Sequence, residues 1–317
     1  MENHSYLICG LTVSFPWPQA TLIESTAKAD VIVELGRATP PPKDLVKFNG
    51  PNCQAAPDHV FFDLDDIGRF SIRNGSNITV EISGDQDVEA LNAFLLGSCL
   101  GVLLIQRNQL VLHAAVLEKN GRQVGFAGGP GSGKSTLSGL LLNSGGRILT
   151  DNIAAIQVEA NAAATVFPSF PSLNLWRPTM EKLGLDDRNP IKLRPELDKY
   201  ILSFEEKFVS EPRPLHTLCI LAPWNKSEIS CERIDGIERI THLSHASFRL
   251  RITRGMEMDE QHFRHIGALS GCIELIKLSF PHDWALNKSL VEIVDELFLS
   301  PDKRRKLQLA NVNPDCI

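Results

Sequence analysis

The sequence predicts an α/β protein with a P-loop core, and a small β-rich domain that precedes this core. A β-prone run at residues 122–127 enters a loop rich in glycine, the loop ends in a Gly-Lys-Ser tripeptide, and an apolar helical pattern begins at Leu137. Short β-prone runs with Pro and Gly breaks come before all of this. We therefore expect a β-rich N-terminal domain with a connecting helix at residues 1–108 and a P-loop domain at residues 109–317.

The N-terminal part contains several predicted strands. The first β-prone runs cover residues 6–13, 30–35 and 59–64. Two further runs, 70–73 and 77–82, alternate apolar with polar residues on either side of Asn74-Gly75, which is a strong signal for a β-hairpin. We expect these last two strands to pair.

A single apolar segment follows the predicted strands. Residues 88–107 present an almost continuous apolar surface, which predicts a helix buried against the next domain. The most apolar part, residues 93–105, has about 13 residues and is shorter than the roughly 20 that a bilayer-spanning helix needs. We therefore expect no membrane partner.

The composition is that of an ordinary globular protein, with 43% hydrophobic and 22% charged residues. The net charge of −6 gives no general attraction for nucleic acid, whose binding depends on Lys and Arg at phosphates. The 7 cysteines are dispersed without a C-x-x-C pair, so their spacing indicates neither a zinc site nor a disulfide framework. The first residues lack the basic and apolar regions of a signal peptide, so we expect a cytoplasmic location by elimination.

The glycine-rich loop matches the P-loop pattern G-x-x-x-x-G-K-[ST] in full. Glycines let backbone N–H groups converge on phosphate oxygens, and the following helix directs its positive N-terminal end at the same anion. Lys134 is expected to reach the β- and γ-phosphates of ATP, and the Ser135 hydroxyl is expected to bind Mg²⁺. The predicted nucleotide-binding residues are Gly128, Gly129, Pro130, Gly131, Ser132, Gly133, Lys134, Ser135 and Thr136.

Predicted strands flank the loop on both sides. Residues 110–117 form one predicted strand that carries His113, and residues 147–156 form an apolar strand interrupted at Asp151. An acidic residue that ends a strand one helix after a P-loop stands where such enzymes place a group near Mg²⁺ or the attacking hydroxyl. An Asp that only serves a turn is the structural alternative.

The rest of the sequence predicts further regular structure. Strands are expected at residues 215–221, 228–233 and 272–278, and helices at residues 236–246, 258–269 and 284–299. The basic cluster at residues 303–306 is interpreted as a solvated helix end.

Several segments together resemble the HPr serine kinase/phosphorylase C-terminal domain family, especially its smaller HPr-kinase-related members. The resemblance depends on His113, the P-loop and the segment Leu149-Thr150-Asp151-Asn152, with further similarity at residues 170–176, 199–200 and 276–281. Residues 10–13, the Asn74-Gly75 hairpin and residues 94–98 are similar to the related kinases encoded with lasso-peptide biosynthesis. The likeness covers most of the chain.

The resemblance implies a P-loop core of the HPr kinase / phosphoenolpyruvate-carboxykinase type and phosphate transfer from ATP to a serine hydroxyl. It implies catalytic roles for Asp151, His113 and Lys134, and a metal site at Ser135, Asp151 and Asn152. The family has an Asp-Asp pair where this chain has Asp151 and Asn152. Asn152 keeps an acceptor oxygen but lacks the charge, so either Asp151 alone acts as the base or activity is reduced. We favour the first, because phosphoryl transfer depends mostly on positioning and charge neutralisation.

The expected function is therefore transfer of the γ-phosphate of ATP, with Mg²⁺, to a hydroxyl of a peptide or small protein, for example a natural-product precursor peptide. A kinase of a small hydroxyl-bearing metabolite is the alternative enzyme. A nucleotide-gated binding protein, in which Asn152 marks weakened catalysis, is the alternative from another class. The acceptor stays open, because acceptor pockets are built from loops whose spacing carries no code. Association into a homo-oligomer also stays open, as the resemblance suggests it without establishing it.

Overall fold

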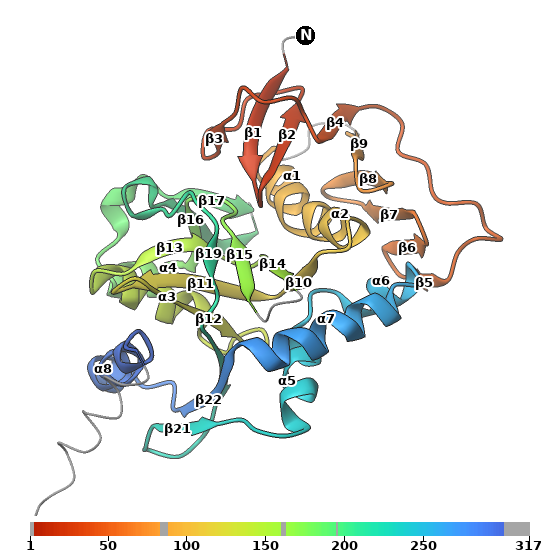
Figure 1. The fold of residues 1–317 in the computed structure, drawn as a ribbon. Coiled ribbons are helices and arrows are strands. Elements are labelled where there is room, and N and C mark those ends of the chain that lie inside the picture. Colours follow the sequence, from red (N-terminus) through yellow and green to blue (C-terminus); the bar gives the residue numbers. More distant parts are fainter. Residues whose placement is uncertain (1–2, 83–87, 160–162, 195, 301–317) are drawn as a thin grey trace, which may run out of the picture.

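The described part of the chain contains sheets of nine, six, four and three strands with helices between them (Figure 1). The computed structural model describes residues 3–82, 88–159, 163–194 and 196–300, so the basic cluster at residues 303–306 lies outside the described residues. The protein is a mixed α/β fold with several sheets, which agrees with the predicted fold class at this level.

The N-terminal part forms the nine-stranded sheet, in the order β3-β1-β2-β4-β9-β8-β7-β6-β5. Its strands are β1 (His4–Ile8), β2 (Leu11–Phe15), β3 (Ile23–Glu24), β4 (Val31–Leu35), β5 (Phe48–Gly50), β6 (Cys53–Ala56), β7 (His59–Leu64), β8 (Gly68–Arg73) and β9 (Asn77–Glu81). The predicted hairpin is confirmed, since β8 pairs antiparallel with β9 across Asn74 and Gly75, which both have positive φ. The single strand predicted over residues 6–13 is wrong, because Cys9 and Gly10 take positive φ and divide it into the hairpin of β1 and β2.

A long helical segment packs against this sheet and links it to the rest of the chain (Figure 1). It consists of α1 (Val88–Phe94), a π-helical turn at Leu95–Cys99 and α2 (Leu100–Gln106), so the predicted helix is confirmed. Val88–Gln106 spans 19 residues with a mean hydropathy of 2.0, so by length and composition it could cross a membrane, although the sequence suggested a shorter apolar run. However, 67% of its apolar window is buried inside the protein, as in the core helix of a soluble protein.

The six-stranded sheet carries the glycine-rich loop. Its order is β13-β11-β12-β20-β22-β21, formed by β11 (Ala114–Lys119), β12 (Arg122–Ala127), β13 (Arg147–Thr150), β20 (Thr217–Pro223), β21 (Ser230–Arg233) and β22 (Glu274–Phe280). β12, β20 and β22 run parallel, so their carboxyl ends meet at one edge. The loop follows β12 at this edge and leads into α3 (Lys134–Asn143). Ligands of open α/β sheets bind at such an edge.

The chain passes three times between this sheet and the four-stranded sheet, whose order is β10-β14-β15-β19. The strands of the latter are β10 (Leu110–Leu112), β14 (Ala154–Val158), β15 (Ala164–Phe167) and β19 (Arg213–Pro214). The single strand predicted over residues 110–117 is therefore wrong, because β10 and β11 belong to different sheets and His113 lies between them. The predicted strand 147–156 likewise divides into β13 and β14 at Asp151 and Asn152. His113 and Asp151 thus both lie where the chain changes sheets.

A three-stranded sheet and five helices complete the described regular structure. The sheet has the order β16-β18-β17, with β16 (Ser172–Trp176), β17 (Ile191–Arg194) and β18 (Leu197–Ser203). The helices are α4 (Arg177–Lys182), α5 (Glu238–Ala246), α6 (Leu250–Gly255), α7 (Asp259–Cys272) and α8 (Asn287–Leu297), and short 3₁₀ turns occur at Asp186–Arg188, Glu205–Lys207 and Trp284–Leu286. The distal strands and helices predicted from the sequence correspond to β20, β21, β22, α5, α7 and α8, whereas α6 and the three-stranded sheet were not predicted.

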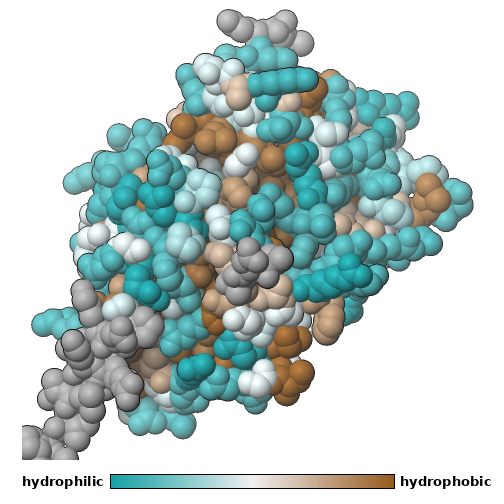
Figure 2. Space-filling model, viewed as in Figure 1, coloured by the Kyte–Doolittle hydropathy of each residue, from teal (hydrophilic) through white to brown (hydrophobic). Residues whose placement is uncertain are grey.

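Buried apolar residues gather in several clusters. One lies between the nine-stranded sheet and the long helix, one surrounds α3 and α8, and one packs α5 and α7 against the four-stranded sheet. The first also contains Val111, Ala155 and Phe248, so the core of the N-terminal part extends beyond residue 108, and the predicted domain boundary stays a prediction. On the face in Figure 2 hydrophilic residues predominate, and hydrophobic side chains show in separate groups.

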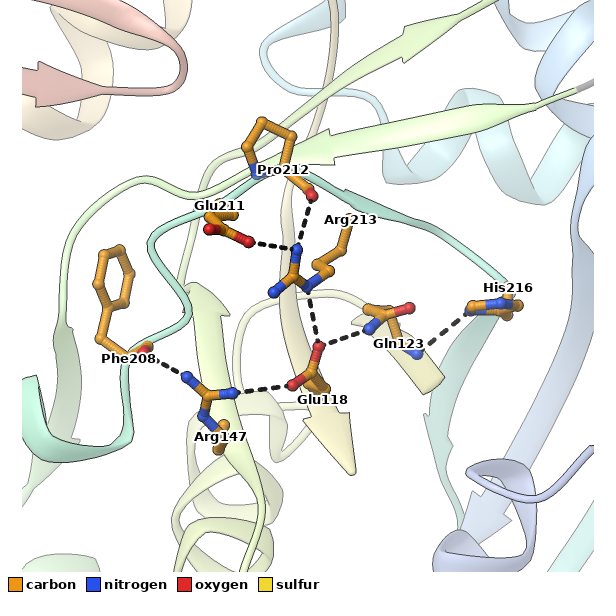
Figure 3. A network of polar contacts seen from close by, with 8 residues as sticks. All are labelled: Glu118, Gln123, Arg147, Phe208, Glu211, Pro212, Arg213 and His216. Carbon is orange, nitrogen blue, oxygen red and sulfur yellow. Dashed lines mark hydrogen bonds and ion pairs between the residues drawn. The ribbon is translucent and has the colours of Figure 1, made fainter. Parts of the chain in front are cut away.

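A polar network lies at the end of β11 and β12 that is remote from the glycine-rich loop (Figure 3). Glu118 is 9% exposed and accepts a hydrogen bond from Gln123 Nε2 at 2.7 Å. It also accepts from Arg147 Nη1 at 3.1 Å and from Arg213 Nε at 3.3 Å. Gln123 N donates to His216 Nδ1 at 3.3 Å. These bonds join β11, β12, β13 and β19, and they satisfy a buried carboxylate with two guanidinium groups.

Candidate active site

The loop between β12 and α3 forms a backbone cradle. A Cβ atom at Gly128 would lie 2.9 Å from Leu221 O, so only glycine fits there, whereas Gly129 and Gly131 face open space. Gly131 takes a φ of 76°, a conformation that favours glycine. Ser132 Oγ is buried and has no hydrogen-bond partner within the described residues. Open space beside glycines and an unpartnered hydroxyl both suit an oxyanion bound by backbone N–H groups.

Lys134 begins α3, and its ammonium group folds back onto the loop. Its Nζ donates to Gly128 O at 2.7 Å and to Gly129 O at 3.2 Å. Burial lowers the pKa of Lys134, and the nearby Asp151 raises it while Lys199 lowers it. Neutral carbonyls are weaker partners for an ammonium group than phosphate oxygens are, so a bound phosphate would displace them.

Asp151 follows β13 and is held in a strained turn. Ile153 N donates to Asp151 O at 2.8 Å around Asn152, whose φ is 71°, and this is the rare form of γ-turn with positive φ. The Asp151 side chain is only 5% exposed, and its Oδ2 accepts from Asn174 N at 3.2 Å. Burial raises the pKa of the Asp151 carboxyl, although Asn174, Lys199 and Lys134 each lower it. A carboxyl group with a raised pKa is suited to take a proton from a hydroxyl group.

His113 lies beside this turn. Its backbone N donates to Ala246 O at 2.7 Å, and its Nδ1 is 3.1 Å from Asn152 O. A carbonyl oxygen only accepts, so we assign the ring proton to Nδ1, and Nε2 is left as an acceptor. Burial, followed by the charge of Lys134, lowers the pKa of His113 to about 4. The imidazole is therefore neutral at neutral pH, and it offers a lone pair rather than a positive charge.

These groups meet in one cavity of about 700 Å³. The wall includes residues 130–136 of the loop and helix, together with His113, Asp151 and Asn152. Gly128 and Gly129 line an adjoining cavity of about 390 Å³, which shares His113 and Asn152 with the first. All predicted site residues thus come together at the carboxyl edge of the six-stranded sheet, while their roles stay predictions.

The cavity also contains residues outside the predicted set of site residues. Phe94, Gly97 and Ser98 come from the long N-terminal helix, and Arg249 immediately precedes α6. The wall further includes Asn174, Trp176, Arg194, Lys199 and Trp284. Asn174, Trp176 and Lys199 belong to segments that carry the family resemblance, which is the signal that could have found them. Ser98 lies in the segment 94–98, which also carries part of the resemblance, whereas no periodicity or motif marks Arg249.

Positive charge exceeds negative charge on the cavity wall. The cations are Lys134, Arg194, Lys199 and Arg249, and the carboxylates are Asp151 and Asp283. None of these cations forms an ion pair within the described residues. A concave site with unbalanced cations attracts anionic ligands.

The residues present fit a magnesium nucleotide. The open glycine cradle, the unpartnered Ser132 hydroxyl and the excess of cations suit a polyphosphate. Ser135 and Asp151 provide hard oxygen ligands, and Asn152 provides a neutral one. No group of three or more His, Cys, Asp or Glu that could hold a metal occurs in the part of the chain that the structure describes. Mg²⁺ is commonly held by one or two carboxylates plus substrate phosphates, which needs no such group.

Comparison with known proteins adds little to this geometry. No family model matches the chain, and no curated protein matches it. Among solved structures the chain is similar to the Hpr(Ser) kinase/phosphatase from Coxiella burnetii, with 13% sequence identity and a TM-score of 0.33, over 64% of this chain and 99% of that chain. At this TM-score the likeness is remote and carries no argument about function.

Proposed function

We propose that the protein is an ATP-dependent phosphotransferase of the HPr-kinase-related type, which transfers the γ-phosphate to a hydroxyl group of a peptide or small protein. One observation carries the proposal: a glycine-rich cradle with its lysine shares a cavity with the buried carboxyl group of Asp151 and the neutral imidazole of His113. Phosphoryl transfer depends on positioning the donor and acceptor and on neutralising charge, and this cavity has groups for each task.

The loop and the start of α3 would hold the donor. Backbone N–H groups of the loop, to which Pro130 contributes none, would surround the phosphate oxygens, and Lys134 would exchange its carbonyl partners for them. Ser135, Asp151 and Asn152, which all line the main cavity, would hold Mg²⁺. Bound Mg²⁺·ATP supplies the transferable phosphoryl group.

Asp151 and His113 would contact the acceptor, Asp151 as the base and His113 as an orienting group. Asp151 takes the proton of the acceptor hydroxyl group, for which its raised pKa is favourable. His113 accepts a hydrogen bond at Nε2 from another N–H or O–H group of the acceptor, because Asn152 O already fixes its Nδ1 proton and the reacting hydroxyl group donates its single proton to Asp151. The strained turn at Asn152 thus sets the positions of both groups.

The size of the site favours an acceptor larger than a water molecule. The adjoining cavity of about 390 Å³ gives room beside the loop, and Trp176, which is 50% exposed, lines the main cavity. A small hydroxyl-bearing metabolite would also fit this volume. A short synthetic peptide that competes in the transfer reaction favours a peptide acceptor over a small metabolite. Tight ATP binding without turnover of any acceptor would instead indicate a nucleotide-gated binding protein.

The proposal is tested by transfer of label from γ-labelled ATP to serine-containing peptides in the presence of Mg²⁺. We expect Asp151→Asn and Lys134→Ala each to reduce the transfer rate by roughly 10²- to 10⁴-fold, since one loses the base and the other a phosphate contact. Asp187→Asn, which changes an exposed carboxylate outside the cavity, serves as the matched control. Unchanged transfer in the Asp151 and Lys134 variants would contradict the assigned roles.

A further inference from the structure

Arg249 is a cation without a protein anion, and it lies where the two cavities meet. It lines both the cavity of about 700 Å³ and the adjoining one of about 390 Å³. It forms no ion pair within the described residues. The nearby thiols of Cys53 and Cys99 do not balance it, because burial raises the pKa of Cys53 to about 12 and that of Cys99 well above its usual range.

The guanidinium group of Arg249 is held in place by the N-terminal part of the protein. Its Nη2 donates to Ser98 Oγ at 2.5 Å. Its Cζ lies 5.5 Å from the ring centroid of Phe62, 5.9 Å from that of Phe94 and 5.6 Å from that of Phe248. The Arg249 backbone has a φ of 45°, which residues other than glycine rarely adopt. Strain of this kind persists where the surrounding structure imposes it, and it is concentrated at functional sites.

Most of the hydrogen-bond donors of this group are unused. A guanidinium group has five N–H donors, and one hydrogen bond from the Arg249 side chain is present within the described residues. The O–H of Ser98 likewise has no acceptor in that part of the chain. Arg239, a structural arginine by contrast, donates to Ile234 O at 3.1 Å and to Ile273 O at 2.6 Å. Arg249 therefore has guanidinium N–H groups without a protein acceptor in the described part of the chain, and this residue lines a cavity.

The smaller cavity joins Arg249 to His113 and to the first residues of the glycine-rich loop. It includes Arg249, His113 and residues 128–130, but Lys134, Ser135 and Asp151 line only the larger cavity. The charges of Lys134 and Arg249 both lower the pKa of His113, so both cations lie near the imidazole. An anion bound to Arg249 from the smaller cavity would thus lie near His113, in a space that Lys134, Ser135 and Asp151 do not line.

We propose that Arg249 and Ser98 form an oxyanion subsite, which binds a carboxylate or phosphate group that the acceptor carries near its reacting hydroxyl group. The inference rests on the proposed phosphotransferase function, because that function assigns the cavity lined by His113 and Arg249 to the acceptor. A guanidinium group binds the two oxyanions with the same paired N–H geometry. The acceptor class is therefore a hydroxyl compound or peptide with an acidic group beside the phosphorylated position.

The subsite is tested by isothermal titration calorimetry on the full chain with the P-loop saturated by Mg²⁺·ADP. The probes are O-phospho-L-serine and N-acetyl-L-aspartate amide, and the tighter of the two identifies which oxyanion the subsite prefers. We expect Arg249→Gln to weaken binding of the preferred probe by about tenfold or more, and Ser98→Ala to weaken it less. Arg251→Gln removes the same charge from an exposed position in α6 outside both cavities, and it should leave the affinity unchanged.

Other outcomes have distinct meanings. Equal probe affinity in wild type and Arg249→Gln, or no probe binding to a wild-type protein that binds Mg²⁺·ADP, overturns the subsite. If the wild-type protein does not bind Mg²⁺·ADP, the result contradicts the proposed function and not the subsite. The subsite is then tested by measuring probe binding without nucleotide. Lys134→Ala should lose nucleotide affinity and keep the Arg249-dependent binding, and thermal unfolding of each variant shows whether it is folded.

Discussion

The hairpin of β11 and β12 has a different charge environment at each end. At its turn end, Glu118 is almost fully buried and is matched by Arg147, Arg213 and Gln123. At its other end, where β12 enters the glycine-rich loop, the cavity wall has more cations than carboxylates. The first arrangement satisfies its charges within the protein. The second leaves them for a ligand, so balanced charge indicates a structural role and unbalanced charge a binding role.

The largest expected effect concerns the balanced end. Glu118→Ala should lower the free energy of unfolding by about 2–3 kcal/mol, because Gln123 Nε2 loses its acceptor and two guanidinium groups each lose one of their acceptors. The cost is below that of a fully buried pair, since the side chains of Arg147 and Arg213 are 48% and 33% exposed. Mg²⁺·ADP affinity should not change, as Glu118 lies outside the cavity. Urea denaturation and calorimetry measure the two quantities.

Glu211→Ala is the matched control at that end. Glu211 pairs with the same Arg213 at 2.8 Å, but its side chain is 71% exposed. Its removal should change the free energy of unfolding by less than about 0.5 kcal/mol. If both substitutions destabilise the protein equally, burial of Glu118 is not the reason that the network stabilises the fold.

An intermediate effect is expected from a cation in the cavity. Lys199→Met should change the free energy of unfolding little, because Lys199 forms no ion pair within the described residues, and the substitution removes both a repulsion of Lys134 and an attraction to Asp151. The same substitution should slow phosphoryl transfer by about tenfold, since it removes a positive charge near the transferred group. Lys199 lies over the ring of Trp176 at 5.8 Å from its centroid.

The control for this substitution is another lysine that lies over a tryptophan. Lys182 is 4.7 Å from the ring centroid of Trp284, but it is exposed and lies outside the cavity wall. Lys182→Met should leave both transfer and stability unchanged. Strong destabilisation by Lys199→Met would show that this lysine stabilises the fold. The contrast between charges that serve the fold at one end of the hairpin and charges that serve a ligand at the other would then be wrong.

Features that depend on a few neighbouring residues could be predicted from the sequence. The Asn74-Gly75 hairpin and the strand, loop and helix around Lys134 each follow from local conformational preferences. The interruption of the predicted strand at Asp151 could also be predicted, because a polar residue divides an apolar run there. Local signals were sufficient for these elements.

Features that depend on partners distant in sequence could not be predicted. His113 interrupts an apolar run that reads as one strand, and only the pairing of β10 with β14 and of β11 with β12 shows that the run divides between two sheets. Arg249 lies at the site because it packs against Phe62 and Phe94, which are more than 150 residues away in the sequence. Such contacts leave no periodic pattern in the sequence.

The smallest expected effect is a pH dependence at the balanced end. His216 Nδ1 accepts from Gln123 N, and burial, followed by the charge of Arg122, lowers the pKa of His216 below its usual value of 6.5. Below pH 6.5 the unfolded chain therefore binds a proton that the folded protein does not, so this contribution to stability is present above pH 6.5 and is lost as the pH falls towards the folded pKa. His216→Asn keeps an acceptor near the Nδ1 position but cannot titrate. The stability difference between wild type and this variant should be constant from about pH 7.5 to 9 and should shift against the wild type below about pH 6.5. The other histidines are common to both proteins and cancel, so parallel stability curves measured by urea denaturation would show that protonation of His216 does not weaken this end of the hairpin.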